Sequence, residues 1–381
     1  MGVDNPHPLA MGTAPAALAE LGWDLGWAAA FAPFEEPAQW PARVTASRRD
    51  AWVVALQAGD RDAVAAGRLR HAAIGPADLP AVGDWVVVAG GANDGANGDG
   101  PMVIRAVLPR RTVFRRGAEE GHAVDQQVLA ANVDVALVMA GLDGDFNLRR
   151  IERYLAVAYA GGATPVVVLN KTDIATDLAG LRSAADTVAP GTEVFAISAR
   201  TGEGVNDLAE RHLVPGRTAV VLGSSGVGKS TLVNALIGYE RMSTGAVRGD
   251  DARGRHTTTH RELVRLPGGA LLIDTPGIRS LGVAGAADGL GSAFSDITDI
   301  AVGCRFTDCQ HEREPGCAVR TALADGRLTR ARLESQRKLE KEAAHVARSG
   351  DRLLREAERK RWKAISQASS RHMDAKYGRD R

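Results

Sequence analysis

The sequence predicts a multidomain α/β protein with three parts: a small antiparallel β-barrel, a domain built on a parallel sheet with helices on both faces, and a helical C-terminal part with a metal site. Three observations lead to this prediction. Short alternating apolar runs extend from residue 41 to 116, buried-strand candidates then alternate with helical stretches, and a cysteine cluster followed by charged helices ends the chain. A chain of 381 residues is also too long for one ordinary core.

The domain boundaries follow from these changes of pattern. Residues 1–38 are rich in Ala, Gly and Pro, and we expect an N-terminal extension with one short helix. Runs such as "GDWVVVAG" and "PMVIRAVLP" place the barrel at 39–118. The α/β domain is expected at 119–290, and the helical metal-binding part with its basic tail at 291–381.

Five apolar runs are the expected strands of the parallel sheet. Stretches of helical period such as "NLRRIERYLAVAYAGG" lie between them, which is the pattern of a parallel sheet covered on both faces. The five runs are 133–142, 164–170, 192–198, 217–223 and 269–275.

The composition is that of a soluble globular protein, with 45% hydrophobic and 24% charged residues. No apolar stretch approaches the roughly 18–20 residues that span a bilayer, and the N-terminus lacks a secretory pattern, so we expect a cytoplasmic protein without membrane contact. The net charge is +1, but residues 320–381 carry 18 Lys and Arg against nine Asp and Glu. This basic end indicates contact with a polyanion or, alternatively, the solvated surface of a charged helix.

The stretch "GSSGVGKS" at 223–230 has the spacing of a phosphate-binding loop between a strand and a helix. Its glycines let successive backbone amides face phosphate oxygens, and the following helix adds its positive end. Lys229 supplies a charge at the terminal phosphates, and the Ser230 hydroxyl is a ligand for Mg²⁺. The predicted phosphate-binding residues are Gly223, Ser224, Ser225, Gly226, Val227, Gly228, Lys229, Ser230 and Thr231.

A second motif, "LLIDTPG", follows about fifty residues after the phosphate loop. Asp274 stands at the end of its strand, where its carboxylate would hold Mg²⁺ through water. The Gly277 N–H would sense the terminal phosphate.

Two further loops indicate a guanine base. In "NKTD", the Asp173 carboxylate would accept bonds from the N1–H and exocyclic amine of guanine, whereas adenine lacks that amine. Asn170 would read the other edge of the base or brace the loops, and the Lys171 stem would cover a ring face, with Thr172 between them. In "ISARTGEG", Ser198 and Ala199 form the companion loop, where the Ala199 N–H would donate to the guanine O6.

The order of these motifs is unusual, because the base-reading loops precede the phosphate loop and the magnesium turn comes last. A parallel sheet whose termini lie close together tolerates such a circular permutation. The chain then leaves the nucleotide domain directly after "DTPGIRSLG", the segment expected to move with the terminal phosphate.

The segment "GRHTTTHREL" at 254–263 is the expected switch. We expect Thr258, or else Thr257, to close over Mg²⁺. Ile278 stands where a water-orienting glutamine is common, so His256 is the candidate for positioning the attacking water. The alternatives are that His256 is only a polar loop residue, or that His260 has this role.

All three cysteines lie in "CRFTDCQHEREPGC". Three thiolates and one imidazole suit a closed, structural tetrahedral zinc site, whereas a disulfide would leave one cysteine unpaired. Unrelated buried thiols are the alternative. The four predicted ligands are Cys304, Cys309, His311 and Cys317.

With these motifs, the chain resembles the small ribosomal subunit-dependent GTPase A family (RsgA or YjeQ) from about residue 40 to 360. "PAVGDWV", "GRHTTT", "DTPG" before an apolar residue, and "CRFTDCQHEREPGCAV" carry the resemblance beside the permuted motif order. It implies an OB-fold barrel that contacts rRNA, a circularly permuted P-loop GTPase domain and a helical zinc domain. It also implies a catalytic role for His256, beside Lys229 and Thr258.

The function implied by the resemblance is a GTPase that binds the 30S subunit and its 16S rRNA as a late maturation checkpoint. GTP hydrolysis would be stimulated by the subunit and would drive release, and we expect a monomer that binds GTP and GDP. The alternatives are a GTP-gated RNA-binding switch whose hydrolysis is incidental, and a nucleotide-dependent metabolic enzyme. Phosphate contacts on the barrel are expected from arginines rather than from base stacking, unless these are simply solvated: Arg43, Arg48, Arg49, Arg110, Arg111, Arg115 and Arg116.

Overall fold

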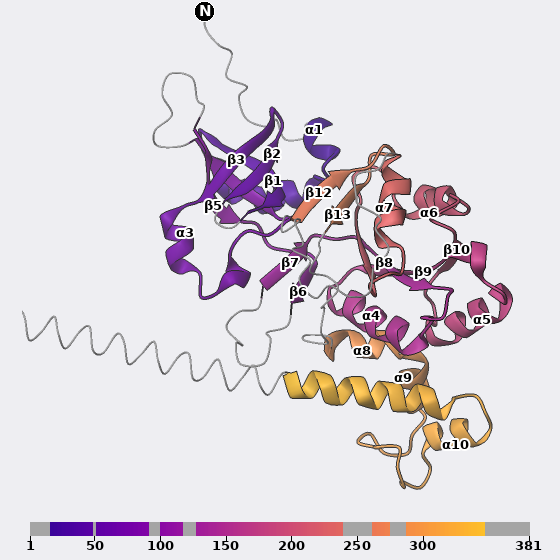
Figure 1. Cartoon of the computed structure of the whole chain (residues 1–381). Coiled ribbons are helices and arrows are strands. Elements are labelled where there is room, and N and C mark those ends of the chain that lie inside the picture. Colours follow the sequence, from indigo (N-terminus) through magenta and orange to yellow (C-terminus); the bar gives the residue numbers. More distant parts are fainter. Residues whose placement is uncertain are drawn as a thin grey trace, which may run out of the picture.

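The structure is a computed structural model that describes residues 16–48, 51–90, 100–116, 127–238, 261–274 and 287–346 (Figure 1). Several predicted residues lie outside these ranges, as do most of the Gly-rich 90–100 segment and the tail beyond residue 346. The predicted residues outside are Arg49, His256, Thr257, Thr258, His260, Gly277 and Ile278.

Five strands close the predicted barrel. They are joined in the order β1-β2-β3-β5-β4, and β4 returns to pair with β1. Helix α3 (Gly67–Ala72) stands between β3 and β4, and Val44, Val54 and Ile104 fill the interior. The strands are β1 (Gln39–Ser47), β2 (Trp52–Leu56), β3 (Gly59–Ala65), β4 (Trp85–Ala89) and β5 (Met102–Val107).

The second half of the predicted extension is packed on this barrel. It forms α1 (Ala16–Ala19), α2 (Leu25–Phe31) and a 3₁₀ turn at Ala32–Phe34. Trp23 and Trp27 are buried against Trp85, with 4.7 Å between the ring centroids of Trp23 and Trp85. The segment 16–34 therefore adds buried side chains to the core around Trp85.

The predicted parallel sheet is present and is covered on both faces. Its strand order is β10-β9-β8-β11-β13-β12, and only β12 runs antiparallel to its neighbour. Alternate residues enter two clusters: Val138 of β8 packs with α4, while Leu137 packs with α6 and α7. The strands are β8 (Val135–Gly141), β9 (Thr164–Asn170), β10 (Val194–Ile197), β11 (Thr218–Gly223), β12 (Arg261–Arg265) and β13 (Leu271–Asp274), and the helices are α4 (Leu148–Ala160), α5 (Leu178–Val188), α6 (Val205–His212) and α7 (Lys229–Ile237).

The barrel and the parallel sheet share hydrogen-bonded strands. Strand β1 pairs antiparallel with β12, with Ala46 opposite Glu262 and Ser47 opposite Arg261. Figure 1 shows β12 (orange) between the barrel and the parallel strands. A separate two-stranded sheet, β6 (Val113–Arg116) and β7 (Gln127–Ala131), lies on either side of the predicted boundary at 118/119.

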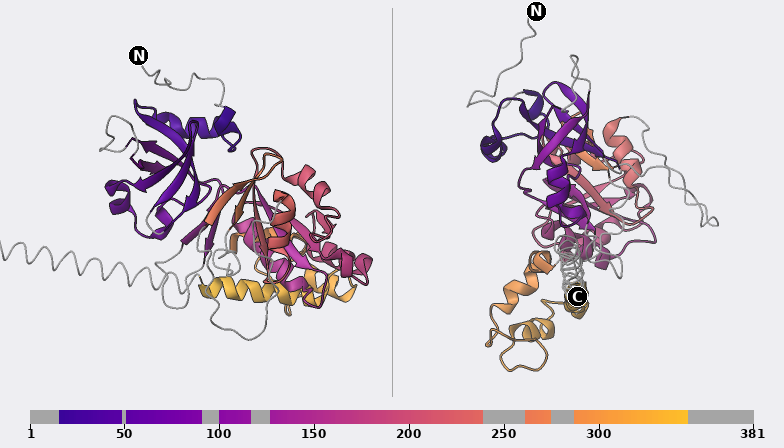
Figure 2. Two further views of the ribbon diagram at one scale, coloured as in Figure 1. Left: turned by 45° about the horizontal axis from the view of Figure 1, so that its top comes forward. Right: turned by 90° about the vertical axis from the view of Figure 1, so that its left-hand side faces the viewer.

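The C-terminal part is helical and lies at the end of the molecule opposite the barrel (Figure 2). Its helices are α8 (Ala287–Ala293), which spans the predicted boundary at 290/291, α9 (Ser295–Ala301), α10 (Ala318–Ala324) and a helix at 330–346. No helix in the described part of the chain is long and apolar enough to cross a membrane.

A buried ion pair fixes the C-terminal part to the nucleotide domain. Arg332 donates to Glu152 of α4 at 2.7 Å and to Asp296 at 2.8 Å, and the Arg332 and Glu152 side chains are 4% and 3% exposed. The guanidinium also lies over the Phe294 ring at 4.2 Å, and Ser335 donates to Glu152. These contacts join helix 330–346 to α4 and α9.

The expected role of the barrel arginines is wrong for Arg43. Arg43 is 2% exposed and donates to the Thr218 hydroxyl at 2.8 Å and to the carbonyls of Leu21, Gly83 and Asn132, so it joins the N-terminal segment, barrel and parallel sheet.

Two more of these arginines are paired with carboxylates of the same chain: Arg110 with the fully buried Asp84, and Arg111 with the exposed Asp24. Arg48 and Arg115 remain exposed, and the side chain of Arg116 lies outside the described residues.

Candidate nucleotide site and metal centre

Three loops meet at one edge of the parallel sheet. They follow β9, β10 and β11, which are parallel strands, so their carboxyl ends lie at the same edge. Ligands of open α/β sheets bind at this edge. The loops carry the "NKTD", "ISARTGEG" and "GSSGVGKS" motifs.

Asn170 is the residue that joins the three loops. It is 2% exposed; its Nδ2 donates to the Val227 carbonyl at 2.9 Å, and its Oδ1 accepts from the Ala199 amide at 2.9 Å. Asn170 was expected either to read an edge of the base or to brace the loops, and in the structure its side chain braces the loops. The Ala199 N–H, expected to face guanine O6, donates here to Asn170.

The Asp173 carboxylate accepts three hydrogen bonds. Ser198 Oγ donates to Oδ1 at 2.6 Å, and Arg200 donates to Oδ2 through Nε at 3.0 Å and Nη2 at 2.5 Å. The bonds from Ser198 and Arg200 lower the pKa of Asp173. The sequence analysis did not single out Arg200, although it stands within the "ISARTGEG" motif.

Lys171 is also held by partners. Its backbone is left-handed, with φ 74°, and its Nζ donates to the Gly226 carbonyl at 2.8 Å and to Asp143 Oδ2 at 2.5 Å. The bond from Lys171 is the main cause that lowers the pKa of Asp143. Asp143 was missed by the sequence analysis; the available signal was its position just after the apolar run at 133–142, at the same edge of the sheet.

The loop after β11 curls as a phosphate-binding loop does. Gly226 and Gly228 have φ of 78° and 99°, and a side chain at Gly228 would lie 2.2 Å from Asn170 Nδ2. Lys229 Nζ donates to the carbonyls of Gly223 at 2.9 Å and Ser224 at 2.5 Å. The Lys229 side chain is thus held by backbone carbonyls of the loop itself, and α7 begins at Lys229.

The other predicted residues lie around this loop. Ser225 is exposed, Val227 is buried, and Ser230 and Thr231 are partly exposed on the first turn of α7. Asp274 ends β13, which neighbours β11. Thr172 has a buried hydroxyl without a hydrogen-bond partner in the described part of the structure.

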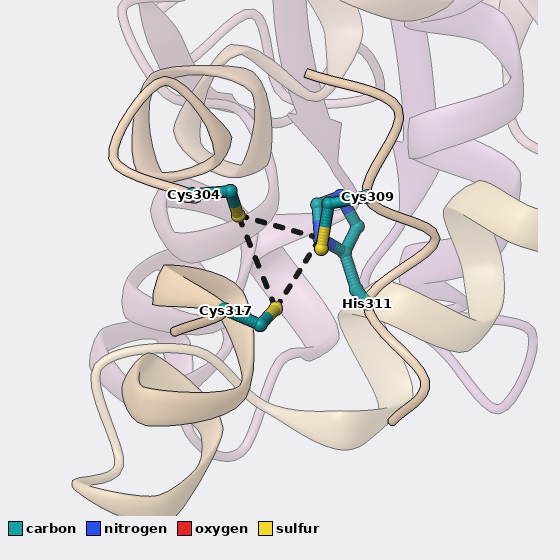
Figure 3. A group of neighbouring side chains, drawn as sticks. All are labelled: Cys304, Cys309, His311 and Cys317. Carbon is teal, nitrogen blue, oxygen red and sulfur yellow. Dashed lines mark hydrogen bonds between the residues drawn. The ribbon is translucent and has the colours of Figure 1, made fainter. Parts of the chain in front are cut away.

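The four predicted zinc ligands come together, with their ligand atoms within 4.8 Å of one another (Figure 3). Cys304 Sγ lies 3.9 Å from Cys317 Sγ and 3.6 Å from His311 Nδ1, and Cys317 Sγ lies 3.4 Å from His311 Nδ1. Tetrahedral zinc with Zn–S of about 2.3 Å and Zn–N of about 2.0 Å would set its ligand atoms about 3.5–3.8 Å apart. The donor set and spacing therefore fit a tetrahedral metal.

Glu314 braces the loop that carries His311. Its carboxylate accepts from the amides of Gln310, Glu312 and Arg313 at 2.8–3.0 Å. Burial and then the charge of Arg337 lower the pKa of His311, which favours the neutral imidazole that a metal ligand requires. The sequence analysis did not predict the role of Glu314.

Known proteins are similar to this chain in sequence. The RsgA GTPase family matches residues 107–284. A protein of Opitutus terrae named small ribosomal subunit biogenesis GTPase RsgA is 49% identical over 92% of this chain and 96% of its own. One of the same name from Streptomyces coelicolor is 44% identical over 95% of this chain and 96% of its own.

Solved structures agree with this assignment. The crystal structure of YjeQ from Thermotoga maritima has a TM-score of 0.59 and 25% identity, covering 80% of this chain and 99% of that one. The crystal structure of YloQ, a circularly permuted GTPase, has a TM-score of 0.57 and 21% identity, covering 82% and 97%, and supports the fold. The chain therefore belongs to the RsgA family of GTPases and is a GTP-hydrolysing enzyme.

Proposed function

We propose that this GTPase acts in the biogenesis of the small ribosomal subunit. The observation that carries the proposal is the meeting of the three motif loops through Asn170, which makes one guanine-nucleotide site in a chain 49% identical to a protein named for that role. The permuted order of the motifs leaves this site intact.

In the proposed site, Asp173 accepts bonds from the guanine N1–H and exocyclic amine, and the amides of 223–231 bind the phosphates. Lys229 is placed at the loop mouth, where its charge stabilises negative charge that develops on the terminal phosphoryl group. Asn170 keeps the base loop and phosphate loop in register, so it is a positioning residue.

The residues proposed to hold Mg²⁺ are oxygen donors. Ser230 follows β11 and Asp274 ends the neighbouring β13, which suits a cation that prefers hydroxyl and carboxylate ligands. Thr258 is the proposed third residue. Bound Mg²⁺ neutralises charge on the β- and γ-phosphates. His256 is proposed to position the attacking water, because Ile278 lacks a group for that task.

The Cys₃His cluster is proposed to hold one structural zinc ion through Cys304, Cys309, His311 and Cys317. The spacing of the sulfur and nitrogen atoms supports this ion, and all four positions of a tetrahedron are filled by protein ligands. The ion would fix the loop 304–317 against α9 and α10.

The proposed partner is the 30S subunit, contacted through its 16S rRNA by a monomer of this chain. We propose a late checkpoint in which the subunit stimulates hydrolysis and hydrolysis drives release. The proposed contacts to rRNA phosphates are the exposed Arg48 and Arg115 and the basic residues of 320–381 other than the buried Arg332. The division into extension, barrel, nucleotide domain and metal-binding part at 38/39, 118/119 and 290/291 is proposed with it, as a division of tasks rather than of packing, because residues 16–34 pack on the barrel and both β6–β7 and α8 cross a boundary.

The test is GTP hydrolysis by the purified chain alone and with 30S subunits, 50S subunits or naked RNA, with Lys229→Ala as the inactive control. We expect strong stimulation by 30S subunits alone. Equal rates in all four mixtures would contradict the subunit-specific role. His256→Ala then separates a checkpoint from an RNA-binding switch: the checkpoint requires that both stimulated hydrolysis and release from the subunit fail in this variant.

A further inference from the structure

We propose that Arg200 is a specificity-determining residue, which competes with the guanine base for the Asp173 carboxylate. This inference rests on the proposed function, because it requires Asp173 to be the group that reads the base. It goes further by assigning to Arg200 of this chain an effect that weakens guanine binding.

The geometry places Arg200 on one carboxylate oxygen. Both Nε and Nη2 of Arg200 donate to Asp173 Oδ2, at 3.0 and 2.5 Å. The Arg200 side chain is 71% exposed, whereas that of Asp173 is 12% exposed. The arginine is therefore free to leave into solvent, while the carboxylate is fixed in the loop.

The other oxygen is held by the loop itself. Ser198 is fully buried and donates through Oγ to Asp173 Oδ1 at 2.6 Å. The same hydroxyl accepts from the Thr201 amide at 3.2 Å, and the Ser198 carbonyl accepts from Gly202 at 2.8 Å. Since these bonds form the turn, Ser198 stays in place when a base enters.

The Asp173 carboxylate has too few acceptor positions for Ser198, Arg200 and guanine together. A carboxylate offers about four lone-pair positions, two on each oxygen. Ser198 occupies one on Oδ1 and Arg200 occupies both on Oδ2, so only one position, on Oδ1, is not taken by another residue. Guanine brings two donors, N1–H and one exocyclic N–H. At least one hydrogen bond from Arg200 must therefore break before both guanine donors can bond to the Asp173 carboxylate.

Hypoxanthine provides the comparison, because it has the N1–H but no exocyclic amine. Its single donor needs only the one position that remains, so it does not have to displace Arg200. Arg200 thus weakens the binding of GDP relative to that of IDP. The positive charge of Arg200 attracts the phosphates of both nucleotides equally, so this attraction cancels in the ratio of the two affinities.

The experiment measures displacement of mant-GDP from the full chain by GDP, IDP and ADP. The variants are Arg200→Ala and Arg200→Lys, which keeps the charge with a less rigid donor. Arg211→Ala is the matched control, since Arg211 is 66% exposed and likewise paired with one carboxylate, Glu193. We expect Arg200→Ala to raise the preference for GDP over IDP about two- to fivefold, the size of one exposed ion pair.

We expect Arg200→Lys to lie between Arg200→Ala and the unchanged protein, and Arg211→Ala to leave the ratio unchanged. An unchanged or smaller ratio in Arg200→Ala overturns the proposal, because Arg200 then does not compete with the exocyclic amine. The proposed function fails separately: in the unchanged protein, displacement by ADP as strong as by GDP would show that the site does not read guanine at all.

Discussion

A single methyl group added at Gly289 should weaken the contact between the C-terminal part and the nucleotide domain. Gly289 is buried in α8, where that helix crosses α4. A Cβ at this position would lie 2.1 Å from the Ala156 carbonyl oxygen and 2.5 Å from the Ala160 nitrogen. Both obstacles are backbone atoms, so no side-chain rotation relieves the overlap.

The structure sets the size of the effect. An ordinary C···O contact is about 3.3 Å, so the helices must move apart by about 1 Å. Overpacking of this kind costs about 1–3 kcal/mol, and rigid backbone obstacles place Gly289→Ala at the upper end. Better helix propensity returns about 1 kcal/mol. We therefore expect a net loss of about 1–2 kcal/mol.

Gly291→Ala is the matched control, because it lies in the same helix and a Cβ there meets nothing within 4 Å. It should gain about 1 kcal/mol from propensity alone. The assay is the urea midpoint by circular dichroism, together with limited proteolysis to locate the first part to open. We expect Gly289→Ala to lower the midpoint and to open the chain near α8 first.

A urea midpoint that rises in Gly289→Ala as much as in Gly291→Ala would contradict a steric overlap between α8 and α4. In that case the two helices either do not pack this closely or can separate without loss. A lower midpoint with cleavage first in the barrel would likewise contradict an effect at the α4–α8 contact.

Three further predictions follow from buried charges and from the metal site. Arg332→Met should cost about 3–5 kcal/mol of unfolding free energy because it leaves Glu152 buried and unpaired, and adding Glu152→Gln should recover part of that loss in a urea titration. Burial raises the pKa of Asp84, against the opposing bond from Arg110, so the folded state binds protons more readily than the unfolded state above pH 3.8. Arg110→Met should raise that pKa further, and the loss in melting temperature should be larger at pH 8 than at pH 5; a loss independent of pH would contradict this. Cys317→Ser or a strong chelator should release one zinc ion per chain, measured by a colorimetric zinc assay, and should lower the melting temperature; full zinc content in Cys317→Ser would exclude that ligand.

The elements that the sequence predicted correctly have local signals. The run at 164–170 became β9 at the same residues, and the run at 217–223 became β11 within one residue. Apolar runs ended by polar turns specify such strands without knowledge of the rest of the chain. The cysteine spacing likewise predicted a cluster whose ligand atoms the structure brings within 4.8 Å of one another.

The features that were missed depend on segments far apart in the sequence. Arg43 looks like a surface cation on a short strand, but its donors reach carbonyls of Leu21 and Asn132 and the Thr218 hydroxyl. Nothing in the residues near Arg43 indicates these partners. Arg200 was missed for a different reason, because the motif around it is defined by its neighbours and the arginine makes its contact across to the preceding strand's loop.

Strand β12 would be a free edge if the nucleotide domain stood alone. It is the last strand of that domain's sheet, and the outer edge of its first two residues, Arg261 and Glu262, pairs with Ser47 and Ala46 of the barrel. An uncovered edge strand is a template for pairing with another chain. The barrel thus has a protective task that is independent of any ligand: it caps a sheet that would otherwise be open to intermolecular pairing. Separating the two domains by truncation would expose that edge and favour aggregation.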